Sequence, residues 1–205
     1  MILMIEFRDG CIILEDKVMN MLDEFVCEVF PIIERFFDYV IVGGYIAILF
    51  GRSRTTEDID TLIHPGTLSI DVIRRFYEEL EENGFWCFNA HKYTSGFEYL
   101  RNGLALRIAR INEIIPNVEL KCAKKQIDFE TLKNKLTLYM GACKLHICPL
   151  EACIAYKFYL GSQKDIEDAV HIFCVFKDNI KLDTLRKYLS LLGISYSDVM
   201  RFLRC

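Results

Sequence analysis

The segment Tyr39-Val-Ile-Val-Gly-Gly-Tyr-Ile-Ala-Ile-Leu-Phe-Gly-Arg-Ser-Arg-Thr-Thr-Glu-Asp-Ile-Asp-Thr-Leu-Ile63 decides the fold. It predicts a buried strand, a Gly-Gly turn, a short helix, an arginine-containing loop and a second strand that carries Asp58 and Asp60. Successive side chains of a strand point to opposite faces, so the two aspartates share one face. Two neighbouring carboxylates repel each other unless a cation lies between them. Mg²⁺ is the expected ion, because it binds oxygen ligands and accompanies phosphate groups.

The residues between the two strands suit a phosphate group. A glycine pair at the start of a helix, Gly43-Gly44, lets backbone N–H groups approach a phosphate, although an ordinary tight turn would have the same sequence. Arg52 and Arg54 follow the helix and could contact triphosphate oxygens through paired N–H groups, or could lie on a solvated loop. Thr56 could contribute a hydroxyl group there, or could order the strand that follows. Gly43, Gly44, Arg52, Arg54 and Thr56 are therefore candidates for phosphate contacts, each with a structural alternative.

The composition indicates a folded protein without an overall basic charge. Hydrophobic residues make up 52% of the 205 residues, which excludes disorder and provides for a core. With 25 basic and 29 acidic residues, the chain has no global charge that would favour nonspecific nucleic-acid binding. The apolar runs are shorter than the roughly 20 residues of a membrane helix, and charges follow the N-terminal apolar residues at once. We expect no contact with a membrane and no export signal.

The nine cysteines show no Cys-x-x-Cys pair, and several lie in apolar runs, among them Cys27, Cys87, Cys153 and Cys174. An odd number without ligand spacing favours buried thiols over zinc ligands or a disulfide framework. Such cysteine usage is typical of a cytoplasmic protein, although an intracellular protein of a hyperthermophile could still form some disulfides. We therefore expect a cytoplasmic protein with buried thiols.

Apolar periodicity and turn residues predict an α/β domain followed by helices alone. Strands are expected at residues 1–14 around Asp9-Gly10, 40–42, 85–88 and 118–121. Helices are expected at 15–37, from 70 to near Asn83-Gly84, and at 129–136. Asn102-Gly103 predicts a hairpin between 97–100 and 104–108, and Gly141-Ala142 a second one between 138–140 and 144–147. Helices follow at 149–160, 163–176, 183–192 and 195–203. The predicted division is an α/β domain at 1–148 and a helical subdomain at 149–205.

A second block of polar residues lies in the helical part. Pro149-Leu-Glu-Ala-Cys-Ile-Ala-Tyr-Lys157 is followed by Gln163-Lys-Asp-Ile-Glu-Asp168. Together with Val42-Gly-Gly and the Asp-x-Asp pair that follows after 13 intervening residues, it resembles the DNA polymerase β-type nucleotidyltransferase superfamily. Within it, the sequence is most similar to the minimal branch of abortive-infection type IV toxins. The resemblance covers residues 38–63 and 149–170 and implies a small mixed sheet flanked by helices.

The resemblance also implies roles for individual residues. In such proteins an aspartate pair and a third acidic residue on a neighbouring strand bind two Mg²⁺ ions, for which Mn²⁺ can substitute. Asp58 and Asp60 match the pair. Glu119, between Val118 and Leu120, is the preferred third acid, with Glu98 as its rival. Lys157 would contact the nucleotide, unless it is a surface lysine, and Asp165 would complete the site. The superfamily often has Gly-Ser at the turn, so a hydroxyl contact to phosphate is missing here.

The implied activity is metal-dependent transfer of a nucleoside monophosphate from an NTP to a hydroxyl group, with release of pyrophosphate. The acceptor could be an RNA or tRNA 3′ end, a protein side chain or a small molecule, and the protein could be a toxin with an antitoxin partner. Lys121, Lys124 and Lys125 form the basic run that could receive nucleic acid, or a solvated face. The alternative is a catalytically inactive protein of the same fold that binds a nucleotide or a partner.

Overall fold

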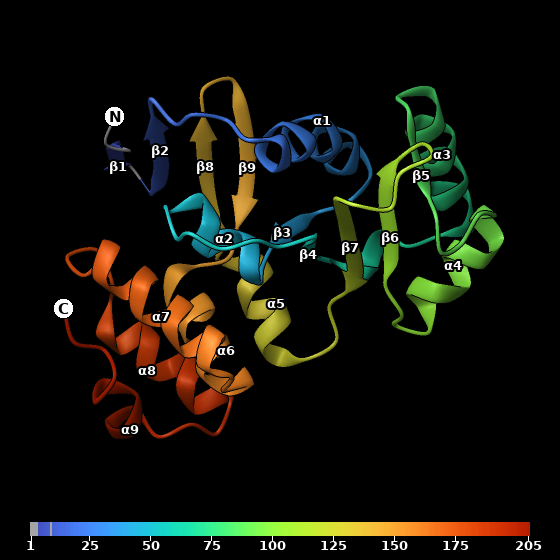
Figure 1. Cartoon of the computed structure of the whole chain (residues 1–205). Coiled ribbons are helices and arrows are strands. Elements are labelled where there is room, and N and C mark those ends of the chain that lie inside the picture. The colour runs from blue at the N-terminus through green and yellow to red at the C-terminus, as the bar shows by residue number, and fades with distance from the viewer. Residues whose placement is uncertain (1–3, 9) are drawn as a thin grey trace.

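The structure, a computed structural model, describes residues 4–8 and 10–205, and in this part of the chain nine strands form one mixed sheet with helices around it (Figure 1). The strands are β1 (Met4–Arg8), β2 (Cys11–Glu15), β3 (Tyr39–Ile41), β4 (Asp58–Ile63), β5 (Phe85–Cys87), β6 (Leu106–Arg110), β7 (Asn117–Cys122), β8 (Leu136–Met140) and β9 (Cys143–Ile147). The helices are α1 (Met21–Phe36), α2 (Gly44–Leu49), η1 (Pro65–Thr67), α3 (Ile70–Glu82), α4 (Tyr93–Arg101), α5 (Gln126–Lys133), α6 (Leu150–Leu160), α7 (Gln163–Val175), α8 (Leu182–Leu191) and α9 (Tyr196–Met200). The predicted α/β architecture is confirmed, although the sheet is larger than expected.

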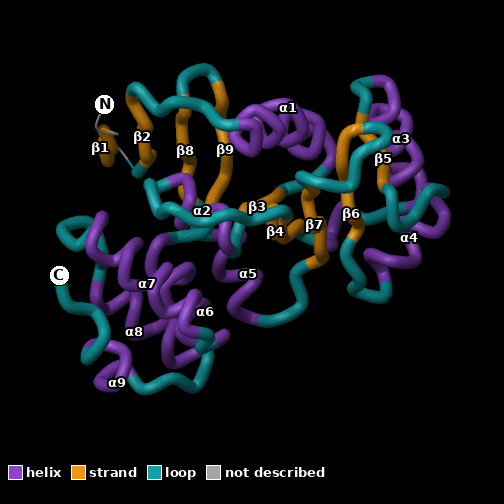
Figure 2. Tube along the Cα trace, in the orientation of Figure 1, coloured by secondary structure: helices purple, strands orange, loops and turns teal. Residues whose placement is uncertain are grey.

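The sheet has the order β1-β2-β8-β9-β3-β4-β7-β6-β5 and consists of two halves. Figure 2 shows β2, β8 and β9 side by side in one half, and β6 beside β5 in the other. The halves meet between β9 and β3, where Ile41 is paired with Ile147 and the Cys148 N–H donates to Ile41 O at 2.9 Å. Because β3 is three residues long and fully buried, this junction lies inside the core.

Helix α1 begins later than its apolar pattern predicts. The Asn20 side chain accepts hydrogen bonds from the Leu22 and Asp23 N–H groups, both at 2.9 Å, and so caps the helix at Met21. Pro31 lies inside α1 without ending it. The predicted strand pair around Asp9-Gly10 forms as β1 and β2, but Asp9 and residues 1–3 lie outside the described residues.

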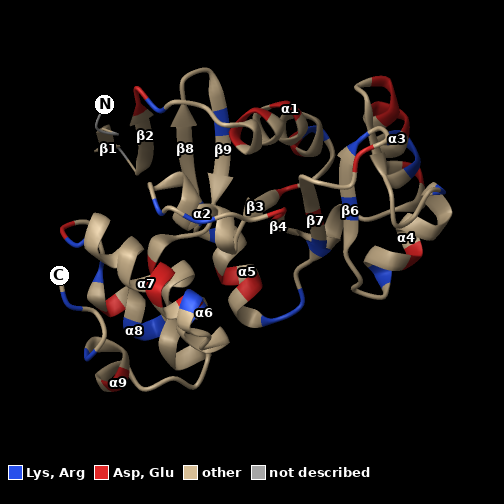
Figure 3. Cartoon of the chain, in the orientation of Figure 1, with Lys and Arg blue, Asp and Glu red and all other residues tan. Residues whose placement is uncertain are grey.

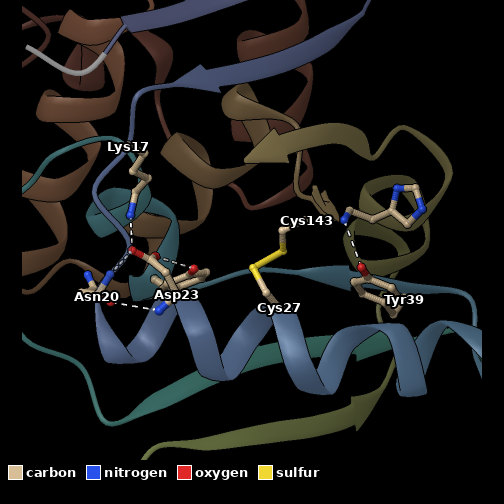
Figure 4. Close-up of a disulfide and its surroundings, with 8 residues drawn as sticks. Lys17, Asn20, Asp23, Cys27, Tyr39 and Cys143 are labelled. Atoms are coloured by element: carbon tan, nitrogen blue, oxygen red, sulfur yellow. Dashed lines mark hydrogen bonds and ion pairs between the residues drawn. A yellow bond between two sulfur atoms is a disulfide. The ribbon is translucent and has the colours of Figure 1, made fainter. Parts of the chain in front are cut away.

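A buried acid on α1 holds the helix that follows the Gly-Gly turn. Asp23 is fully buried and accepts a hydrogen bond from the Tyr45 hydroxyl of α2 at 2.8 Å, and it pairs with the Lys17 ammonium (Figure 4). Burial raises the pKa of Tyr45, so this hydroxyl remains a donor. The contact fixes α2, and with it the turn at Gly43-Gly44, against α1.

Two disulfides correct the expectation of free thiols. Cys27 of α1 is bonded to Cys143 of β9, as Figure 4 shows, and Cys174 of α7 is bonded to Cys205. The bonded pairs lie 116 and 31 positions apart in the sequence, so no local spacing could indicate them. The other five cysteines are free, and four of these are buried.

The predicted hairpin at residues 97–108 is wrong. Residues 97–100 belong to α4, which ends at Asn102-Gly103 before the chain enters β6. Gly103 has φ +70° and its N–H donates to Leu100 O, while the Leu104 N–H donates to Tyr99 O. This is the arrangement of a glycine-terminated helix. Asn-Gly suits both a hairpin turn and a helix end, and the tertiary packing of α4 against α3 decides between them.

The C-terminal helices α6 to α9 gather at one end of the molecule, away from α3 and α4 (Figure 1). As predicted, α6 follows Pro149 and ends at Gly161, and α7 is capped by the Ser162 hydroxyl, which accepts from the Asp165 N–H at 3.2 Å. Ile154 and Ala155 of α6 are fully buried in the same hydrophobic cluster as the sheet. The division at residue 148 stays a prediction. None of the described helices has both the length and the apolar character of a membrane span.

Candidate functional site

A cleft of about 600 Å³ lies where the Gly43-Gly44 turn and residues 54–62 meet α6 and α7. Eight of the ten residues that the sequence predicts for the site line it: Gly43, Gly44, Arg54, Thr56, Asp58, Asp60, Lys157 and Asp165. The remaining two, Arg52 and Glu119, are bonded to residues of the same region, as described below. The fold thus brings the two sequence blocks together around one cavity.

Three acidic side chains on neighbouring strands form what we call the carboxylate cluster: Asp58 and Asp60 of β4 and Glu119 of β7. Both aspartates point to the same face because they are two residues apart on a strand. In the parallel pairing of β4 with β7, Asp60 lies opposite Glu119. The Asp58 carboxylate accepts a hydrogen bond from the Thr56 hydroxyl at 3.0 Å, so Thr56 orders the start of β4. The rival acid Glu98 lies on α4, exposed and 3.6 Å from Arg101.

Two cations contact the carboxylate cluster. The Lys121 ammonium lies 2.6 Å from Glu119 Oε2 and 3.1 Å from Asp60 Oδ1. The Arg107 guanidinium of β6 donates to Glu119 Oε1 at 2.5 Å. Burial disfavours the ionised form of Glu119, but these two contacts outweigh it and lower its pKa. Asp60 differs, because burial raises its pKa, Asp58 and Glu119 add to the effect, and Lys121 opposes it only in part.

The turn before α2 lies directly against the carboxylate cluster. Gly43 has φ +78°, a backbone conformation that residues other than glycine rarely adopt. A Cβ atom at Gly43 would also collide with Asp60 Oδ2. At Gly44 a Cβ atom would meet the end of the Arg54 side chain, so the guanidinium of Arg54 lies against the turn. Glycine is therefore required at position 43 by the site as well as by the turn, whereas at Gly44 only the flexible end of Arg54 would have to move.

Three basic side chains form what we call the cation cluster: Arg52, Arg54 and Lys157. All three bind Asp168 of α7, which is fully buried. Asp168 Oδ1 accepts from Arg52 Nε at 2.8 Å, and Oδ2 accepts from Arg54 Nη1 at 2.6 Å and from Lys157 Nζ at 2.7 Å. Figure 3 shows acidic and basic positions close together where α6 meets α7. Asp168 therefore fixes cations from two distant parts of the chain at the cleft.

Asp168 is the residue whose importance the sequence analysis missed. The sequence assigned Asp165 to the site, but this carboxylate lies 3.5 Å from Lys157 and also accepts from the Ser162 hydroxyl at 2.5 Å. The signal was present, since Asp168 is the last residue of the quoted motif and lies one helical turn after Asp165. Lys157 is not a surface lysine, because it is 3% exposed.

The lysines that follow Glu119 lie at the mouth of the cleft, with Lys121 half-buried and Lys124 and Lys125 exposed. Lys121, Lys124 and Lys125 all line the cleft. Lys124 donates to Gly103 O at 3.1 Å, and the Lys125 ammonium lies 5.4 Å from the centre of the Tyr159 ring. The cleft therefore has an acidic part on β4 and cationic side chains around it.

The donor set of the carboxylate cluster fits one divalent cation better than two. Asp58 and Asp60 offer neighbouring carboxylates to the cleft, which is the chemistry that Mg²⁺ favours. Both oxygens of Glu119 are engaged by Arg107 and Lys121. Among the described residues, no group of three His, Cys, Asp or Glu side chains is arranged to hold a metal ion. Two ions with Glu119 as a ligand stay a prediction.

Comparisons with known proteins add a distant likeness to solved structures. No protein-family model matches the sequence, and no curated protein is similar to it. Among solved structures, the chain is similar to an antigenic nucleotidyltransferase-like protein from Paracoccidioides brasiliensis, with 20% identity and a TM-score of 0.49. The likeness covers 86% of this chain and 95% of that chain. The function is therefore inferred from the side chains of the cleft.

Proposed function

We propose that the protein is a metal-dependent nucleotidyltransferase. The observation that carries this proposal is the presence, in one cleft, of the Asp58 and Asp60 carboxylates together with Arg54 and Lys157 of the cation cluster. Such a site offers negative charge for a divalent cation and positive charge for a triphosphate. A metal-bound nucleotide carries both matching groups, since its metal ion would bind the carboxylates and its phosphates would bind the basic side chains.

The reaction would join the oxygen of an acceptor hydroxyl to the α-phosphorus of an NTP and break the bond from that phosphorus to pyrophosphate, with the hydroxyl proton released to solvent. Asp58 and Asp60 would hold a divalent cation, which supplies charge stabilisation for the triphosphate and a lowered pKa for the acceptor hydroxyl. The protein itself would mainly position the reactants, because phosphoryl transfer requires little covalent chemistry from side chains.

The cation cluster would bind the triphosphate and the departing pyrophosphate. Arg54 supports this role directly, because it lines the cleft and its buried Nε has no hydrogen-bond partner within the described residues. A phosphate oxygen would satisfy this donor, whose burial without a partner is otherwise costly. Asp168 would act as a positioning residue by holding Arg54 and Lys157 at the required place.

Several finer expectations remain part of the proposal. Membership of the abortive-infection type IV branch, a role as a toxin, an antitoxin partner and a cytoplasmic location all rest on the sequence resemblance or on composition. The acceptor, whether RNA 3′ end, protein hydroxyl or small molecule, is left open. The six lysine and arginine side chains that line the cleft are compatible with each of these acceptors.

The test is transfer of label from α-³²P-labelled NTPs to candidate acceptors in the presence of Mg²⁺. Wild type should transfer label, and Asp58→Asn and Asp60→Asn should reduce transfer by at least about a hundredfold, the scale of losing a main electrostatic contributor. Transfer that survives both substitutions would contradict the proposal. Tight NTP binding by wild type without any transfer would instead support the inactive binding protein.

A further inference from the structure

We propose that the Lys121 ammonium takes the place of a second metal ion, so that the carboxylate cluster holds one divalent cation, bound by Asp58 and Asp60. This inference rests on the proposed function, since it concerns the same site. It replaces the expected two-ion arrangement by one metal ion and one fixed side-chain cation.

Lys121 occupies a bridging position between two acids of different strands. Its Nζ atom lies 2.6 Å from Glu119 Oε2 and 3.1 Å from Asp60 Oδ1. In a two-ion site, the second metal ion would bridge Asp60 and Glu119 at this position. The register of the sheet explains how Lys121 reaches this point. Lys121 lies two residues after Glu119 on the same face of β7, and β7 runs beside β4.

Glu119 is closed to a metal ion by its surroundings. Its second oxygen, Oε1, accepts from Arg107 at 2.5 Å, so each oxygen already has a cationic partner. The Glu119 side chain is 10% exposed, and Lys121, at 38%, lines the cleft in front of it. To ligate an ion, the nearly buried Glu119 carboxylate would have to give up its contact with Lys121 or with Arg107, and a nearly buried charge that loses a partner is costly.

The charge of the site leads to the same conclusion. The three carboxylates and the two cations, Lys121 and Arg107, sum to one negative charge. One divalent cation would bring this sum to about +1, and a second would bring it to about +3. Without Lys121, the same three acids could balance a second ion far better.

An ammonium differs from a metal ion in that it donates hydrogen bonds but offers no coordination sites. Lys121 is therefore a positioning residue that holds the carboxylates of Asp60 and Glu119 in place.

The experiment counts the Mn²⁺ ions bound per chain, by electron paramagnetic resonance and by calorimetry, without nucleotide. Wild type should bind one ion, and Lys121→Met should bind two. The double variant Lys121→Met with Glu119→Gln should return to one, because the second ion needs Glu119. Lys124→Met is the matched control and should still bind one ion, since Lys124 lines the same cleft but contacts Gly103 O. Circular dichroism checks that each variant is folded.

Two ions on wild type, or a Lys121→Met variant that still binds one, would overturn the inference. No ion on wild type would overturn it as well, because Asp58 and Asp60 would then hold none. The count is independent of turnover. One ion bound by a protein that transfers no label would contradict the proposed function and leave this inference standing, whereas two ions on an active enzyme would do the reverse.

Discussion

The two charged clusters of the cleft are built in opposite ways. The charges of the cation cluster are paired within the protein, because Arg52, Arg54 and Lys157 share the fully buried Asp168. The carboxylate cluster is open, because Asp58 and Asp60 face the cleft and only Glu119 is enclosed by cations. Burial even raises the pKa of Asp60, which shows that its charge is poorly compensated by the protein.

This difference separates stability from function within one site. A cluster whose cations share a fully buried carboxylate contributes to the stability of the fold. A cluster whose charges remain unbalanced costs stability and favours an external cation. The cation cluster would bind the anionic phosphates, and the carboxylate cluster would bind a metal ion. The following changes test this contrast, from the largest expected effect to the smallest.

The largest effect is expected from Asp168→Asn. This substitution leaves three cations near a buried position without their shared carboxylate, and we expect the free energy of unfolding to fall by about 3–5 kcal/mol. Urea unfolding, followed by circular dichroism, measures it. The matched control is Asp165→Asn, which removes a carboxylate that lies 3.5 Å from Lys157, and it should cost less than about 1 kcal/mol. Equal losses for the two variants would show that Asp168 is not the centre of the cation cluster.

A smaller effect is expected from Gly43→Ala, compared with Gly141→Ala. Both glycines have positive φ, at +78° and +58°, so both substitutions are strained, and Gly43, with ψ −149°, lies in a region that is essentially restricted to glycine. Only the alanine at position 43 would also collide with Asp60, since nothing lies within 4 Å of a Cβ at Gly141. We expect Gly43→Ala to be less stable than Gly141→Ala by about 1–3 kcal/mol in urea unfolding. Equal stabilities would mean that the turn does not press against the carboxylate cluster.

The smallest effects are expected from Asp60→Asn and Glu119→Gln, and they should have opposite signs. The pKa of Asp60 is raised above 3.8, so its ionisation costs stability as the pH rises through that range; Asp60→Asn should therefore stabilise the protein at pH 7. The pKa of Glu119 is lowered below 4.5, so it adds stability above that value, which is lost as the pH falls through the lowered pKa. Glu119→Gln should therefore destabilise the protein at pH 7.

Both differences should stay below about 1 kcal/mol, because the partners of these acids are partly exposed to solvent. Each should shrink toward zero in acid, where the wild-type carboxylates are protonated. The measurement is urea unfolding of both variants and wild type between pH 3 and pH 7. Two variants that change stability in the same direction at pH 7 would contradict the difference between Asp60 and Glu119.

Local features of the cleft could be predicted from the sequence, whereas contacts that depend on the tertiary fold could not. Strand alternation placed Asp58 and Asp60 on one face, and the glycine pair marked the turn, because both signals are local. The partners of Glu119 could not be predicted, since Arg107 and Lys121 reach it through the register of β6, β7 and β4. A disulfide such as Cys27–Cys143 also depends on the tertiary fold, as does the choice of a helix end at Asn102-Gly103.

The most direct test of the central claim compares the fate of two phosphates. Wild-type protein is incubated with Mg²⁺, acceptor preparations and an NTP labelled at either the α- or the γ-phosphate. Nucleotidyl transfer predicts that the α-label becomes attached to an acceptor, while the γ-label is recovered in pyrophosphate, and that both events disappear in Asp60→Asn. Attachment of the γ-label to an acceptor, or release of the γ-label as orthophosphate, would contradict the account.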